Sequence, residues 1–299
     1  MGNINSGKRL YEVNRNFFKV WSSKMAYILG FTCADGNVHG RTLAWDLSDK
    51  HISNIELLKS FNIAMESNYP LKKRDKSYRL RVSNQMILKD IGKLGIVPNK
   101  KKILTFPDVP KNYLRHFIRG FLDGDGWIVS RVRSNGGREV CVGFSNGSYA
   151  FMLSLAEILA SRLGLKDYNL RKREKKMKNG DLSYCYQLEY YSKRANMILE
   201  LLYGSLDSED LMLGRKYERM IVAKANFLEE EKRKEMGALF YNYEQDKNID
   251  VIDFVGKCYW RERLLPREIA DQLGVSLSAL YRFMNKFKIK DKEYIRYGE

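Results

Sequence analysis

The sequence contains one nine-residue pattern twice, and both copies end in an Asp-Gly pair. Residues 28–36 read Ile-Leu-Gly-Phe-Thr-Cys-Ala-Asp-Gly, and residues 118–126 read Ile-Arg-Gly-Phe-Leu-Asp-Gly-Asp-Gly. Asp35 and Asp125 are therefore 90 positions apart, a spacing that indicates a duplicated domain. Two matching half-sites that meet at a pseudo-twofold axis suit a substrate that itself has nearly twofold symmetry. Duplex DNA is the obvious candidate.

Small residues recur at every fourth position in each copy, namely at Ala26, Gly30 and Ala34 and again at Gly120 and Gly124. At helical spacing such residues form a flat stripe, which lets two helix backbones approach closely. We expect helices over about 23–35 and 111–125, the first beginning at the N-cap candidates Ser22 and Ser23 and followed by Gly36 as its C′ residue. If the stripes pack together, both aspartates lie at the same end of the helix pair.

Asp35 and Asp125 would then repel one another at the C-terminal ends of two helices, where the helix dipole also disfavours negative charge. A divalent cation such as Mg²⁺ or Mn²⁺ removes this conflict, because it binds hard carboxylate and carbonyl oxygens, here including the carbonyls of Ala34 and Gly124. Such an ion also activates a water molecule and neutralises a leaving oxygen. The pair of motifs therefore predicts metal-dependent phosphodiester chemistry.

The remaining periodicities predict an α+β fold with a repeat of about 100 residues that occurs twice. Strand-like segments are expected at 37–47, 77–83, 127–133, 138–145, 166–174 and 183–190, and further helices near 51–64, 84–94, 147–163 and 192–204. We expect a first repeat at 1–110, a second at 111–227, a helical or flexible connector at 228–248 and a separate module at 249–299.

The net charge of +17, from 53 Lys and Arg against 36 Asp and Glu, indicates a polyanionic partner. The four cysteines are far apart, with no Cys-x-x-Cys, and the chain has three histidines, so neither a zinc site nor a disulfide framework is expected. No apolar run is long enough for a membrane span and no signal peptide is recognisable. We therefore expect a cytoplasmic protein with no membrane partner.

Basic side chains cluster at equivalent places in the two repeats. On strands they would line a saddle and contact either base edges or phosphates. In the first repeat the DNA-contact candidates lie on the late hairpin and are Lys72, Lys73, Arg74, Lys76, Arg79 and Arg81. In the second repeat the early hairpin has Arg131, Arg133 and Arg138, and the late hairpin has Arg171, Lys172, Arg173 and Lys175.

Residues 266–283 have the pattern of a helix-turn-helix. Pro266 fits a first helical position, Gly274 fits a turn that needs positive φ, and Ser276 can cap the second helix. The side chains expected to contact DNA from this small all-α module are Ser276, Ser278, Tyr281 and Arg282.

The two motifs resemble the LAGLIDADG motif of homing endonucleases in its double-motif, single-chain form. Gly30 and Gly120 match the central glycine, and Asp35 and Asp125 match the last aspartate, which in the family is a metal ligand. The resemblance covers roughly residues 15–225 and implies two αββαββα repeats that form a DNA-binding saddle. One departure is Cys33, where the family usually has the first of its two acidic residues.

The resemblance implies a monomeric, Mg²⁺-dependent DNA endonuclease, encoded by a mobile intron or a free-standing gene, that cuts both strands across the minor groove and leaves 3′ overhangs. It also implies catalytic basic residues beside the metals, for which Lys100 and Lys216 are the candidates and Lys101, Lys102 and Arg215 the alternatives. Two other functions stay open: a non-catalytic LAGLIDADG/helix-turn-helix DNA-binding regulator, and an intron maturase. Regulators of that kind have typically lost the acidic residues, whereas Asp35 and Asp125 are both present.

Overall fold

The computed structural model describes residues 10–98, 103–176 and 182–291, which divide into two compact units. The first unit comprises residues up to 130 together with 140–224, and the second comprises 131–139 and the residues from 225 onward. None of the helices among the described residues is long and apolar enough to cross a bilayer.

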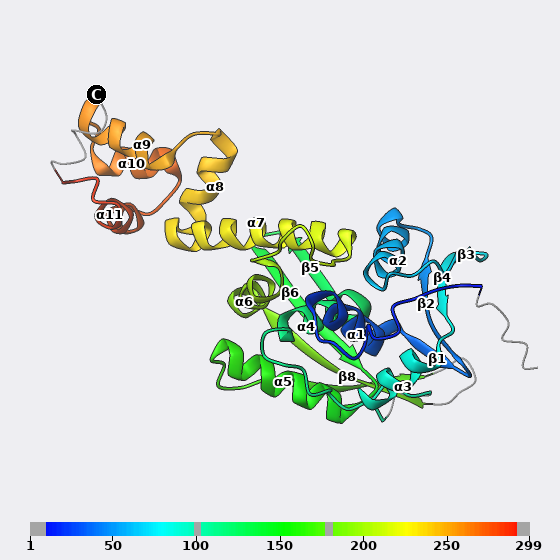
Figure 1. Ribbon diagram of the computed structural model, residues 1–299. Coiled ribbons are helices and arrows are strands. Elements are labelled where there is room, and N and C mark those ends of the chain that lie inside the picture. Colours follow the sequence, from blue (N-terminus) through cyan, green and yellow to red (C-terminus); the bar gives the residue numbers. More distant parts are fainter. Residues whose placement is uncertain (1–9, 99–102, 177–181, 292–299) are drawn as a thin grey trace, which may run out of the picture. The chain divides into compact units, whose positions relative to one another are not determined.

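The first unit contains the αββαββα repeat twice, as the sequence predicted (Figure 1). The elements of the first repeat are α1 (Ser23–Asp35), β1 (Asn37–His39), β2 (Thr42–Ser48), α2 (Ile52–Ala64), β3 (Leu71–Lys73), β4 (Ser77–Val82) and α3 (Gln85–Lys93). Those of the second are α4 (Leu114–Asp125), β5 (Trp127–Val132), β6 (Arg138–Asn146), α5 (Tyr149–Leu163), β7 (Leu170–Lys176), β8 (Leu182–Tyr191) and α6 (Ser192–Tyr203). The second repeat leads into the long helix α7 (Gly214–Met236).

The strands form two four-stranded sheets with the same connectivity. Their orders are β1-β2-β4-β3 and β5-β6-β8-β7. One departure from expectation is the segment 37–47, which is a tight hairpin of β1 and β2 rather than one strand, because the chain turns at Gly40 with φ +55°.

The two repeats bury equivalent aromatic cores. Phe61 of α2 packs edge-on against Phe31 and Trp45, and Phe151, 90 positions later in α5, packs against Phe117 and Phe121. All these rings are almost completely inaccessible to solvent, so each motif helix is attached to the core of its own repeat. Burial of this much aromatic surface contributes strongly to the stability of each half.

α1 and α4 cross where Gly30 and Gly120 lie. A Cβ atom on Gly30 would come within 1.9 Å of the Phe117 carbonyl oxygen, and one on Gly120 within 2.0 Å of the Tyr27 carbonyl oxygen. Only glycine fits at either position, so the expected small-residue contact is present. α1 begins as predicted, since the Ser22 hydroxyl accepts from the Met25 N–H.

Gly36 differs from its expected role as a left-handed C′ residue. Its φ is −73°, and the helix ends here in an extended conformation. A Cβ at this position would lie 2.4 Å from Cγ2 of Thr32 and 2.7 Å from the Thr32 carbonyl oxygen. The glycine is therefore required for space rather than for positive φ.

The second unit has a hydrophobic core of its own, formed by α8 (Ala238–Lys247), α9 (Val251–Gly256), the π-helix η2 (Lys257–Arg261), α10 (Pro266–Leu273) and α11 (Leu277–Lys286). Met236, Phe240 and Tyr241 belong to this core, and the Phe240 and Phe283 rings stack with centroids 4.0 Å apart. The segment 228–248, expected as a helical or flexible connector, is helical, but it forms part of the unit because its apolar residues complete the core.

Candidate active site and nucleic-acid interface

Asp35 and Asp125 are the last residues of α1 and α4, and the helix pair brings them to the same end. A Cβ on Gly124 would lie 2.3 Å from the Cβ of Ala34, so the helices remain in close contact up to the residues that precede both aspartates. Both carboxylates also act electrostatically on the same ammonium group, that of Lys216. Asp35 is exposed and Asp125 is half-buried, which leaves both accessible to a ligand.

This pair of carboxylates fits a hard divalent cation. The described residues contain no group of three or more His, Cys, Asp or Glu side chains that could enclose a metal. Mg²⁺ is typically bound by one or two carboxylates while water and substrate phosphate complete its octahedron. Asp35 and Asp125, with the backbone carbonyls of Ala34 and Gly124 beside them, suit this mode better than a closed structural site.

Lys216, one of the two catalytic lysines expected from the resemblance, lies in the first turn of α7 and is 2% exposed. Its ammonium donates to the carbonyl oxygens of Asp123 at 2.8 Å, Gly126 at 2.7 Å and Leu122. Burial is the main reason that the pKa of Lys216 is lowered to about 8, although the nearby carboxylates oppose this shift. The three carbonyls use all three of its protons, so Lys216 caps the C-terminal end of α4 and must release one partner to act on a water molecule.

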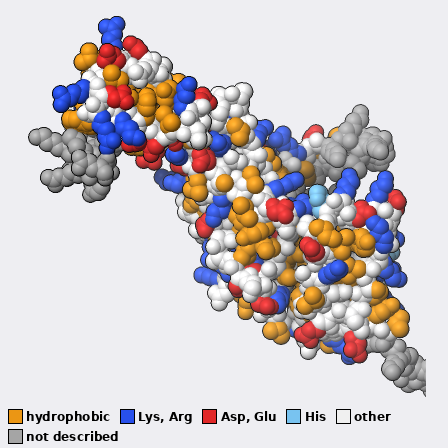
Figure 2. Space-filling view, turned by 90° about the horizontal axis from the view of Figure 1, so that it is seen from above, with side chains coloured by type: hydrophobic (Ala, Val, Ile, Leu, Met, Phe, Trp, Pro, Cys, Tyr) orange, Lys and Arg blue, Asp and Glu red, His pale blue; other side chains and the backbone are white. Residues whose placement is uncertain are grey.

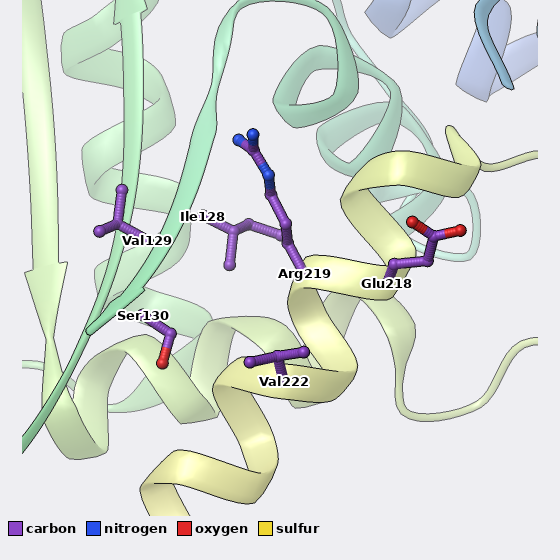
Figure 3. Close-up of a pocket in the computed structure, with 6 residues that line it drawn as sticks. All are labelled: Ile128, Val129, Ser130, Glu218, Arg219 and Val222. Carbon is purple, nitrogen blue, oxygen red and sulfur yellow. The ribbon is translucent and has the colours of Figure 1, made fainter. Parts of the chain in front are cut away.

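Arg215 and Arg219 lie one helical turn apart on α7. Arg215 is half-buried, and its Nε donates to Oδ1 of Asn54 over 3.2 Å. Its pKa is lowered, first by burial and then by the charge of Arg219, while Asp123 and Asp35 act in the opposite direction. Arg219 is exposed and lines a pocket of about 520 Å³ between β5 and α7, where Figure 3 shows its guanidinium extending past Ile128 and away from Glu218. Arg219 was not predicted from the sequence, because its spacing of four from Arg215 becomes informative only once α7 is known to be a helix.

Asp123 is a second residue whose role sequence analysis missed. It is fully buried. Its Oδ1 accepts from the Tyr203 hydroxyl over 2.6 Å, and its Oδ2 accepts from the Tyr27 hydroxyl over 2.6 Å and from the Leu213 N–H over 2.8 Å. The available signal was a charged residue directly after the apolar pair Phe121 and Leu122 of the expected helix, because such a group is buried only with partners.

Successive side chains of a strand point to opposite faces of the sheet, so the basic residues of each cluster are divided between the two faces. In the first sheet Leu80 and Val82 of β4 are buried, so Arg79 and Arg81 project from the opposite, open face, and the register places Lys72 beside Arg79. In the second sheet Arg171 and Arg173 share the open face by the same alternation, whereas Lys172 points to the other side and lies over the Tyr184 ring at 3.9 Å. The side chain of Lys175, the remaining candidate of this hairpin, lies outside the described part of the chain.

Several of the expected DNA-contact residues are held by acidic neighbours. Arg79 pairs with Asp46, Lys73 pairs with Asp49, and Arg74 is 3.9 Å from Asp46. Arg171 lies 3.9 Å from Glu189. Lys76 is exposed. In Figure 2, blue basic side chains lie beside red acidic ones on the first unit. Pairs this exposed are weak, so they orient the basic groups without removing them from a stronger anionic partner.

The tip of the β5–β6 hairpin, residues 131–139, groups with the second unit. Arg131 and Arg133 both pair with Glu139, at 3.1 and 2.6 Å, and their side chains stay 65% and 60% exposed. Arg138 is half-buried; its N–H donates to Glu230 over 2.7 Å, and its guanidinium lies over the Tyr241 ring. Arg131 and Arg133 are thus placed to meet an anion, whereas Arg138 packs within its own unit.

α10 and α11 enclose the turn expected from the sequence. Gly274 has φ +63°, and the Ser276 hydroxyl caps α11 by accepting from the Ala279 N–H. Ser278, Tyr281 and Arg282 are exposed on α11. These three side chains share one accessible helix face, whereas the Ser276 hydroxyl is engaged as a cap.

Lys100, the first-repeat counterpart proposed for Lys216, lies outside the described residues together with its alternatives Lys101 and Lys102. The catalytic roles of Lys100 and Lys216 both stay predictions.

Comparison with known proteins identifies the second repeat. Residues 112–203 match a family model described as a LAGLIDADG-like domain, and no curated protein matches. Among solved structures, a point mutant of I-SmaMI is 12% identical, with 71% of this chain and 93% of that chain covered and a TM-score of 0.48. I-AabMI bound to uncleaved DNA is 10% identical, with 69% of this chain and 91% of that chain covered and a TM-score of 0.45. I-GzeII in complex with its DNA target is 13% identical, with 71% of this chain and 97% of that chain covered and a TM-score of 0.45. The assignment therefore rests on the matched residues: the repeat that contains the second motif matches a LAGLIDADG-like domain, which confirms the resemblance identified from the sequence for that repeat.

Proposed function

We propose that the protein is a site-specific endonuclease of double-stranded DNA whose catalytic centre is the pair Asp35 and Asp125. The observation that carries this proposal is the convergence of the two motif helices. They bring two accessible carboxylates to one place, beside the buried ammonium of Lys216. Like charges at adjacent helix C-termini are unfavourable on their own, so the arrangement fits a site that binds a cation.

In this proposal Asp35 and Asp125 hold Mg²⁺, for which Mn²⁺ can substitute. The bound ion would activate the attacking water and neutralise charge on the leaving oxygen. Arg215 and Arg219 supply positive charge on the adjacent face of α7, where they can hold the negatively charged phosphates of the substrate. Lys216 holds the end of α4 that carries Asp125, and its lowered pKa of about 8 suits a group that exchanges a proton near neutral pH.

The open faces of both sheets would lie on the DNA, with Lys72, Arg79 and Arg81 in one repeat and Arg171 and Arg173 in the other. The exposed face of α11 would lengthen the contact as the recognition helix of a helix-turn-helix. A monomer suffices, because one chain carries both motifs. We further propose cleavage of both strands across the minor groove with 3′ overhangs.

The proposal is tested by selecting cleaved sites from a randomised duplex library with Mg²⁺, using the wild type, Asp35→Asn and Asp125→Asn. Each variant should abolish double-strand cleavage and keep DNA binding, since asparagine preserves the shape but not the charge. Equal cleavage by all three proteins would disprove the assignment. Binding without cleavage by the wild type would instead identify the non-catalytic regulator.

The role of α11 is tested separately with Arg282→Glu, which places a negative charge on its exposed face. Affinity for the selected site should fall and become less dependent on salt, while the cut position stays the same. A shifted cut position would contradict the role given to this helix.

A further inference from the structure

Asp123 is fully buried two residues before Asp125, where α4 meets α1, α6 and the start of α7. Three donors from three separate parts of the chain converge on its carboxylate: the Tyr27 hydroxyl, the Tyr203 hydroxyl and the Leu213 N–H, at 2.6, 2.6 and 2.8 Å. A buried group with its acceptors satisfied in this way fixes the relative positions of the elements that supply its partners.

The contact with Leu213 places α7. The carbonyl oxygen of Leu213 accepts from the N–H groups of Lys216 and Tyr217, at 2.8 and 3.1 Å, so this residue initiates the helix. The Lys216 ammonium then returns to the carbonyls of Asp123 and Gly126. The first turn of α7 is therefore fastened to the end of α4 at two points, one on each side of Asp125 in the sequence.

At the two positions that correspond by pseudo-twofold symmetry to Asp123 and Tyr27, the chain has different residues. At the position that corresponds to Asp123 it has Cys33, and a thiol is only a weak acceptor. The position that corresponds to Tyr27 is Phe117, which has no hydroxyl. Acceptor and donor are both replaced, so the pseudo-twofold counterpart of the Tyr27–Asp123 hydrogen bond cannot form.

We propose that Asp123 is a positioning residue that holds Lys216 and Arg215 in register with Asp125, and that it supports one of the two half-sites only. The inference rests on the proposed endonuclease function. The first repeat's own motif end is held by other contacts, including the hydrogen bond from Trp45 Nε1 to Thr32 Oγ1 over 3.0 Å. Loss of the Asp123 contact should therefore impair cleavage of one strand more than cleavage of the other.

Asp123→Asn is the sharpest variant. It keeps the size of the side chain and an oxygen for Tyr203, but it turns an amide NH₂ toward the Leu213 N–H. With a supercoiled plasmid that carries the selected site, and with each strand labelled separately, one strand should be cut on the order of 10–100-fold more slowly, the range found when partners that orient a metal site are removed. Nicked circles should accumulate. The matched variant Cys33→Ser should leave both rates close to those of the wild type.

Tyr203→Phe removes one donor and leaves the Leu213 contact, so it should give a smaller change with the same strand bias; it also keeps the test valid if Asp123→Asn folds poorly. Amide hydrogen exchange without metal gives a readout independent of activity. Asp123→Asn should accelerate exchange at 213–217 and leave the amides of α1 protected.

Equal slowing of both strands, or faster exchange throughout the first unit, would show a general structural role and overturn the proposal. Unchanged rates and unchanged exchange would overturn it as well. If the wild type cuts neither strand, the proposed function fails instead, and the exchange experiment alone decides whether Asp123 positions α7.

Discussion

α1 presents Leu29 and Cys33 at two buried positions where α4 presents Arg119 and Asp123. The four residues belong to matching positions of the duplicated motif, in helices that pack on equivalent aromatic cores. The first helix therefore fills its interior positions with apolar or weakly polar groups, whereas the second fills them with charges that need partners.

The partners of Arg119 come from the end of α6, from the chain that follows it and from His116 of α4 itself. Its Nε and Nη1 donate to the carbonyl oxygens of Leu211 and Leu202, both at 3.0 Å, and its Nη2 pairs with Asp210 at 3.0 Å. Buried polar networks of this kind add little net stability, but they specify one arrangement of the chain. Both copies of the motif therefore keep the helix contact, but only the second has the charged side chains, Arg119 and Asp123, that attach the segment after α6.

The largest effect is expected from Arg119→Leu, which gives α4 the residue that α1 has. Asp210, whose side chain is 1% exposed, would lose its main buried counter-charge, so the free energy of unfolding should fall by about 3–5 kcal/mol. Leu29→Met is the matched control in α1, and it should cost less than about 1.5 kcal/mol because it conserves volume. Urea denaturation measures the free energy of unfolding of both variants. Similar decreases in Arg119→Leu and Leu29→Met would show that the difference between the two helices does not affect stability.

Gly30→Ala and Gly120→Ala test the part of the comparison that is symmetric. Each added methyl group would overlap a backbone carbonyl of the other helix, and we expect each variant to lose about 2–3 kcal/mol. Gly92→Ala in α3 makes the same substitution in open space and should instead gain about 0.5–1 kcal/mol. Clearly unequal losses at positions 30 and 120 would contradict a pseudo-twofold contact.

The structural features that could be predicted from the sequence are those that depend on the pattern of neighbouring residues. The cap at Ser22, the small residues at Gly30 and Gly120 and the alternation along β4 are encoded within a few residues of the structures that they specify. The convergence of Asp35 and Asp125 follows from the same stripe, because two flat helix faces pack in few ways. These features fix the fold of the repeats and the position of the candidate site.

The rest depends on partners that are distant in sequence. Asp123 meets Tyr203 and Leu213, 80 and 90 positions away, and no local pattern predicts that contact. The second unit was expected to begin at residue 249, but it already includes the residues from 225 onward for a related reason. The sequence near 230 is rich in charged residues, and the contribution of Met236 and Phe240 to the core becomes visible only in the folded structure.

Thr32→Val tests a contact that belongs to the first repeat alone, where the second has Leu122. The Thr32 hydroxyl accepts from Trp45 Nε1, so its removal leaves a buried indole N–H without this acceptor and should cost about 1–3 kcal/mol. Thr105→Val, at an exposed position, is the control and should change stability by less than about 0.5 kcal/mol. Equal effects would mean that the Trp45 contact does not support the first motif.

The smallest effect is expected at His116, whose counterpart in the first repeat is Ala26. Burial, followed by the charge of Arg119, lowers the pKa of His116. Below about pH 6.5 the unfolded chain therefore binds a proton at this residue more readily than the folded protein does, and stability falls as the pH is lowered through this range. The pKa of Asp46 is lowered by hydrogen bonds with Ser77 and Arg79, which outweigh burial, and the pKa of Glu139 is lowered by Arg133 and Arg131. These two groups also lose stabilisation on acidification, but only below their ordinary values near 4. In His116→Gln the decline between about pH 6.5 and 5 should flatten, whatever the stability at neutral pH. An unchanged slope would show that the proton is taken up elsewhere and that His116 adds no pH dependence that Ala26 lacks.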